Sequence, residues 1–131
     1  PAHVTLCRED ELAQCSPDAW RDRLAAAAPM TLTFGLATAF SGHGVLLPCI
    51  GGEPAFHALR VMLLGDTAIR RHEPHLTLAH PRNPRAPQNV PATYADLPVP
   101  MRLTFSTICL IEQSGQEPWQ VLETYTLCGI R

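Results

Sequence analysis

Two short segments of the chain share the same pattern of residues that could do chemistry. His3 and Thr5 frame the first, and His75 and Thr77 frame the second, each with one apolar residue between them. An imidazole has an ordinary pKa near 6.5, so it can take up or release a proton near neutral pH. A threonine hydroxyl can donate a hydrogen bond to a phosphoryl oxygen. Two such pairs together could provide acid and base catalysis on a phosphate ester.

The spacing within each segment predicts that its histidine and threonine act together. Both segments are typical of strands, and side chains two residues apart on a strand point to the same face, about 7 Å apart at roughly 3.3 Å per residue. One His-x-Thr alone is more often structural than catalytic, but two copies with apolar flanks favour a site. If the two strands lie side by side, all four side chains converge on one cleft.

The elements that must position these residues include two helices. Helical spacing of apolar residues, with Trp20 and Phe56 on the core side, predicts one helix capped by residues 16–18 and ending near Ala28. A second helix is predicted over residues 53–64, and Gly65 is its expected stop.

Strands are predicted around the helices. Residues 31–40 and 45–48 form an expected hairpin, and residues 101–113 and 118–127 form a closing hairpin. The proline-rich residues 81–100 are expected to be a loop with one helical turn. The order predicts an α+β fold in which a His-x-Thr strand, a helix or loop, and a hairpin occur twice.

Composition narrows the class of protein. The 131 residues, 46% hydrophobic and 17% charged, fit one domain, and no apolar run approaches the length of a membrane span. A net charge of −2 argues against binding of long duplex nucleic acid and favours a small or terminal phosphate. All ten basic residues are arginines, which excludes lysine Schiff-base chemistry. Five cysteines without a C-x-x-C spacing favour reduced thiols and a cytoplasmic location.

Other titratable residues leave alternatives open. His72, His75 and His80 are close enough for a metal cluster, but no carboxylate or cysteine completes a known ligand spacing, so no metal is expected. Arg70 and Arg71 are neighbours that form either a solvated pair or a ligand clamp. Tyr125 is a candidate for an aromatic side chain beside the cleft, which would suit a nucleobase.

The duplicated motif resembles that of the two-histidine phosphoesterase superfamily, the 2′-5′ RNA ligase and cyclic nucleotide phosphodiesterase group. The resemblance rests on His-Val-Thr-Leu at residues 3–6 and His-Leu-Thr-Leu at residues 75–78, and it extends over most of the chain, including the proline before the second motif and the final hairpin. It implies a bilobal, duplicated α+β fold. Two antiparallel sheets would flank a V-shaped cleft with helices on the outside, and one motif would come from each lobe.

Two departures from the family pattern define further expectations. Members usually have a strand and a helix ahead of the first motif, so either these elements precede residue 1 or one lobe is incomplete. We expect a single domain over residues 1–131 in both cases. Many members have an arginine shortly after the second motif, where this chain has His80. The next arginine is Arg82, which makes it a further candidate for phosphate binding, as is Arg71.

The resemblance also implies an activity. His3 and His75 would be the acid and the base, while Thr5 and Thr77 would hold the nonbridging phosphate oxygens, without a cofactor. The substrate would be a 2′,3′-cyclic phosphate or a 2′-5′ linkage at an RNA terminus or in a small nucleotide, and no membrane partner is expected. The alternative is a module of the same fold that binds a nucleotide or RNA end without turning it over.

Overall fold

The computed structural model describes the chain at residues 3–13, 15, 18, 20–40, 44–65, 72–79, 90–115 and 117–129. Its strands and helices follow one another as β1 (His3–Val4), α1 (Glu9–Leu12), α2 (Trp20–Ala26), β2 (Met30–Phe34), β3 (Thr38–Phe40), β4 (Gly44–Gly51), α3 (Glu53–Leu64), β5 (His75–Ala79), a 3₁₀ turn (Pro91–Tyr94), β6 (Met101–Phe105), β7 (Thr107–Glu112) and β8 (Gln120–Thr126).

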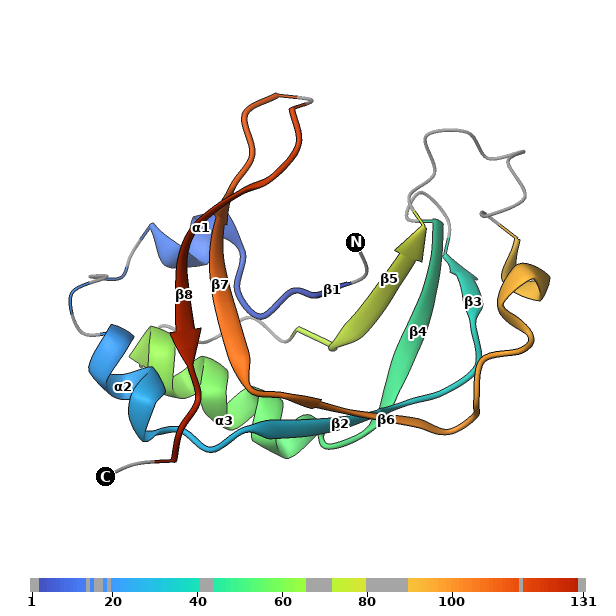
Figure 1. Cartoon of the computed structure of the whole chain (residues 1–131), viewed down its shortest axis with the longest axis horizontal. Coiled ribbons are helices and arrows are strands. Elements are labelled where there is room, and N and C mark those ends of the chain that lie inside the picture. The colour runs from blue at the N-terminus through green and yellow to red at the C-terminus, as the bar shows by residue number, and fades with distance from the viewer. Residues whose placement is uncertain are drawn as a thin grey trace.

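The strands form two antiparallel sheets. In the larger sheet the order is β1-β5-β4-β2-β6, with β3 also paired to β4, and the smaller sheet is the hairpin of β7 and β8. In Figure 1 the strands β4 and β5 rise on one side and β7 and β8 on the other, while β2 and β6 run between them. Helix α2 packs against α3 and β8, and α3 packs against β2. The predicted α+β fold with two antiparallel sheets is confirmed, whereas its internal duplication stays a prediction.

The helices match the sequence patterns to different degrees. Helix α3 has the predicted bounds, and Gly65 ends it with a φ of 64°, a conformation that glycine adopts without strain. Helix α2 ends at Ala26 rather than near Ala28, and the predicted cap at residues 16 and 17 lies outside the described residues. The four-residue helix α1 has no predicted counterpart, because one turn carries no periodicity.

The strands differ from prediction where the chain changes partners. The predicted strand over residues 31–40 is two strands, β2 and β3, which both pair with β4. The predicted run over residues 101–113 is also divided, at Ser106: β6 pairs with β2 in the larger sheet, and β7 pairs with β8. A change of sheet leaves no mark on an apolar run, so the sequence pattern shows it as continuous.

The two motif strands lie in the same sheet. Strand β1 pairs directly with β5, so the expectation of one motif from each lobe is wrong for this chain. The alternative that the two strands lie side by side is confirmed. The first motif strand is also shorter than predicted, because β1 ends at Val4.

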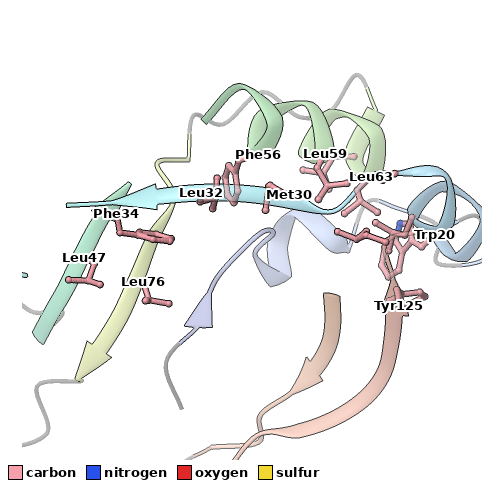
Figure 2. Close-up of a cluster of buried hydrophobic side chains, with 14 residues drawn as sticks. Trp20, Met30, Leu32, Phe34, Leu47, Phe56, Leu59, Leu63, Leu76 and Tyr125 are labelled. Carbon is pink, nitrogen blue, oxygen red and sulfur yellow. The ribbon is translucent and has the colours of Figure 1, made fainter. Parts of the chain in front are cut away.

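The apolar faces of the motif strands pack into one core. Leu76 lies between the two motif positions of β5 and is only 6% exposed, and it faces Leu47 of the neighbouring strand β4. Figure 2 shows this pair joined through Phe34 to the side chains of α3 and α2, including Phe56 and Trp20. Burial of these leucines fixes which face of the strands the histidines and threonines occupy.

A buried ion pair joins the chain after β1 to helix α3. Arg60 of α3 is 2% exposed and is paired with the carboxylate of Glu11 in α1, which is 9% exposed. The Arg60 guanidinium also donates to the backbone carbonyl oxygen of Leu6 at 2.6 Å. Arg60 therefore holds both α1 and the residues that follow the first motif against α3.

This ion pair generates the first testable prediction. Glu11→Gln removes the negative charge that is paired with the buried Arg60 guanidinium, so we expect the free energy of unfolding to fall by about 3 to 5 kcal/mol in urea titrations. The matched control is Glu123→Gln, which breaks the Arg21–Glu123 pair, where the Glu123 side chain is 46% exposed. That substitution should cost less than about 1 kcal/mol. Equal losses in the two variants would contradict a structural role for the buried pair.

Candidate active site

The pairing of β1 with β5 brings the two motifs onto one face of the sheet. His3 lies directly opposite Thr77, and Val4 lies opposite Leu76. Directly opposite residues of an antiparallel pair share a face, and His75 shares that face because it is two residues from Thr77. Three of the four predicted site residues are therefore neighbours on the face opposite Leu76. The fourth, Thr5, comes directly after β1.

The spacing and exposure of these side chains suit a small ligand. His3 and His75 are diagonal neighbours across the strand pair, a relation that separates side chains by roughly 7 to 8 Å. Both histidines and both threonines are half-buried. A group the size of a phosphate can thus reach them while protein atoms surround part of it.

The protonation form of His75 is set by its own backbone. Its Nδ1 lies 3.1 Å from the carbonyl oxygen of Glu73. A carbonyl only accepts hydrogen bonds, so Nδ1 carries the hydrogen and donates it. In the neutral ring Nε2 is then without a hydrogen and can accept a proton, and in the charged ring Nε2 can donate one. His75 is therefore prepared for proton transfer through Nε2.

His3 contacts an aromatic residue that the sequence did not single out. The rings of His3 and Trp119 are 4.3 Å apart between centroids and nearly perpendicular, in an edge-to-face arrangement. Trp119 lies just ahead of β8, and its indole nitrogen donates to the side-chain oxygen of Gln113 at 3.2 Å. This contact joins the smaller sheet to the first motif. A tryptophan beside a turn has no periodic signal, which is why the pattern did not reveal it.

A cavity of about 410 Å³ adjoins the first motif. Consecutive residues line it on both sides, from His3 to Cys7 and from Thr107 to Ile111, so it runs along the edges of β1 and β7. The described lining residues include His3 and Thr5 but neither His75 nor Thr77, and none of them carries an acidic, lysine or arginine side chain. The first motif thus faces an apolar space, and the second lies on the neighbouring strand.

Cys7, a cavity-lining residue close to the first motif, is not prepared for nucleophilic chemistry. Burial raises the pKa of the Cys7 thiol to about 11, although the nearby charge of Arg60 acts in the opposite direction. A thiol with such a pKa is protonated at neutral pH, whereas nucleophilic cysteines react as thiolates. Cys7 is consequently a packing residue beside the site.

His72 holds the backbone of the first motif. Its Nε2 lies 2.9 Å from the carbonyl oxygen of Thr5, and its ring stacks on Phe56 with 5.8 Å between centroids. His72 is only 6% exposed. Burial lowers its pKa below the ordinary value of 6.5, and the charges of Arg60, Arg8 and His75 lower it further, although the bond to Thr5 acts in the opposite direction.

The remaining predicted residues contribute differently. Arg71 and Arg82 lie outside the described residues, as does His80. Tyr125 lines the cavity, yet it belongs to the buried core, and the guanidinium of Arg21 lies 5.6 Å from the centre of its ring. Among the described residues, the aromatic ring recorded against His3 is that of Trp119 rather than that of Tyr125.

Two further properties concern the described part of the chain alone. Within it, no three histidine, cysteine or acidic side chains are grouped so that they could hold a metal ion. No helix in the same residues has the length and apolar character needed to cross a membrane.

The environment of His72 predicts a pH dependence of stability. Because its pKa is lower in the folded chain, the unfolded chain binds more protons below about pH 6.5, and stability falls as the pH drops through this range. The slope for one group is at most about 1.4 kcal/mol per pH unit. We expect His72→Gln to have a flatter profile in urea titrations between pH 7 and 5. The half-buried helix residue His57 provides the control, and a profile flattened equally by His57→Gln would contradict this assignment.

The contact between His3 and Trp119 predicts an optical signal. A protonated imidazole quenches indole fluorescence at short range, so emission from Trp119 should fall when the solution is made acidic enough to protonate His3. We expect His3→Gln to abolish this fall, and Trp119→Phe to leave only emission from Trp20. If the quenching persists unchanged in His3→Gln, the two rings do not meet in solution.

Comparison with known proteins supports the same relationship. No curated protein sequence matches the chain. Residues 1–117, however, match the family model described as the 2′-5′ RNA ligase superfamily. This range contains both His-x-Thr motifs, and it ends two residues before Trp119. Because the match covers most of the chain and includes both motif strands, which pair with each other, this chain belongs to the 2′-5′ RNA ligase superfamily, within the two-histidine phosphoesterases.

Proposed function

We propose that this chain is a metal-independent phosphodiesterase that opens 2′,3′-cyclic phosphates at RNA ends or in small nucleotides. The same chemistry would cleave or form 2′-5′ phosphodiester links. His3 and His75 are its acid and base, and Thr5 and Thr77 hold the phosphate. Membership of the 2′-5′ RNA ligase superfamily supports a phosphoesterase or ligase type of activity on RNA or nucleotide substrates.

The observation that carries the proposal is the register of β1 against β5. With His3 opposite Thr77, and His75 two residues along the same strand, both histidines and one of the two threonines share one face. A site that only bound phosphate would need donors but not two titratable side chains. The fixed Nδ1–H form of His75, with Nε2 left for proton transfer, likewise favours turnover over binding alone.

The proposed reaction needs two proton transfers and one displacement at phosphorus. One histidine, neutral, takes a proton from water while the water oxygen attacks phosphorus in line. The P–O bond to one ribose oxygen breaks, and the other histidine, protonated, gives its proton to that oxygen. A monoester and a free hydroxyl result. When a ribose hydroxyl attacks instead of water, the same steps form a 2′-5′ link.

The threonines contribute through charge that develops on the phosphate. During attack the nonbridging oxygens gain negative charge, and hydroxyl groups that donate to them would stabilise the transition state more than the bound substrate. The apolar lining beside His3 and Thr5 lowers the local dielectric, which strengthens these hydrogen bonds.

The decisive experiment is turnover of the four nucleoside 2′,3′-cyclic monophosphates by the purified chain in excess chelator. His3→Ala and His75→Ala should each lower kcat/KM by about 10² to 10⁴-fold. The double variant should be only slightly worse than either single one, because the two groups act as a unit. Thr5→Val and Thr77→Val keep the side-chain shape and should each cost about 10²-fold.

The control variant is His57→Ala, which removes a histidine of α3 that lies outside both motifs and should leave turnover unchanged. The identity of the monoester shows which ribose oxygen leaves. Absence of turnover in a chain that still binds a nucleotide phosphate by calorimetry would replace the proposal with the binding-module alternative. Turnover that survives both histidine substitutions would overturn the two-histidine mechanism.

A further inference from the structure

The three residues ahead of β5 contact both motifs at once. The side chain of His72 donates from Nε2 to the carbonyl oxygen of Thr5, and the carbonyl oxygen of Glu73 accepts from Nδ1 of His75. We propose that His72 is a positioning residue that holds Thr5 in place beside the second motif, and that residues 72–74 couple the two halves of the site. This inference rests on the proposed function and identifies the residues that align its two motifs.

The backbone ladder between the motif strands ends where His72 acts. The pairing of β1 with β5 contains His3 opposite Thr77 and Val4 opposite Leu76, and β1 ends there. Continuing the same register would place Thr5 opposite His75. At this position the imidazole of His72 binds the Thr5 carbonyl oxygen instead. Backbone pairing thus holds His3 and Val4 of the first motif, and the side chain of His72 holds Thr5.

The coupling segment is itself fixed on two sides. The His72 ring stacks at 5.8 Å on Phe56 of α3, a residue with no exposed surface. Pro74 is buried, and its carbonyl oxygen accepts from the backbone N–H of Cys49 in β4 at 3.3 Å. Since the chain itself makes these contacts, the segment can hold both motifs in a fixed arrangement.

The charges around His72 suit a neutral donor. Arg60 from α3, Arg8 ahead of α1 and His75 from β5 all oppose a second positive charge here, while the carboxylate of Glu11 is engaged with Arg60. A neutral imidazole with its hydrogen on Nε2 still donates to the Thr5 carbonyl oxygen. What the site requires of His72 is therefore the N–H group and not a charge.

A pair of substitutions separates the N–H group from the bulk of the side chain. His72→Gln retains an amide N–H at nearly the same reach, and His72→Leu removes it with a similar volume. On the best cyclic nucleotide we expect His72→Leu to lower kcat about 10²-fold, the effect typical of a misplacement near 1 Å, with a smaller change in KM. His72→Gln should stay within about threefold of the unsubstituted chain, as should the control His57→Gln.

Amide hydrogen exchange provides a readout that does not depend on turnover. The amides of β1 and β5 should exchange faster in His72→Leu than in His72→Gln, while those of β2 and α3 exchange alike in both. His72→Gln behaving like His72→Leu in exchange and in kcat, or His72→Leu leaving both unchanged, would overturn the positioning role. The expected exchange pattern in a chain that turns over no cyclic nucleotide would keep the positioning role and reject the proposed function.

Discussion

The candidate site depends on one buried cation. Among the described residues β1 pairs with β5 at two positions and ends at Val4, so the sheet does not hold the rest of the first motif. Arg60 adds a bond to the Leu6 carbonyl oxygen and pairs with Glu11, which ties the chain after β1 to helix α3. A guanidinium removed from water needs such partners, because an unpaired buried charge costs several kcal/mol. The contacts that compensate the buried charge of Arg60 therefore also attach the first motif to α3.

Much of this fold could be predicted from the sequence where patterns are long or repeated. Helix α3 follows from apolar spacing that ends at Gly65, and the closing hairpin of β7 and β8 follows from two β-rich runs around a turn. The four motif residues could be singled out because a period of two puts His75 and Thr77 on one face while Leu76 enters the core. In each case local spacing and burial give the same answer.

The contacts that complete the site depend on distant parts of the chain and leave no local pattern. His72 resembles a spare histidine until the fold brings it to the Thr5 carbonyl oxygen, 67 positions away in the sequence. Trp119 meets His3 only because the smaller sheet turns toward β1 (Figure 1). The change of pairing partner at Ser106, which creates that smaller sheet, also leaves no signal in the sequence, because β6 and β7 have similar compositions.

The attachment of the first motif has a consequence for the candidate site. Beyond Val4 this segment is held by bonds to the carbonyl oxygens of Thr5 and Leu6 and not by the ladder. It can therefore detach while the core around Phe34 and Phe56 stays packed, because local opening requires far less free energy than global unfolding. Such opening would separate His3 from His75 without any change in the remaining sheet. The fraction of molecules with an assembled site would then depend on the equilibrium between the attached and the detached first motif. Substitutions on α3 can shift this equilibrium although α3 carries neither motif.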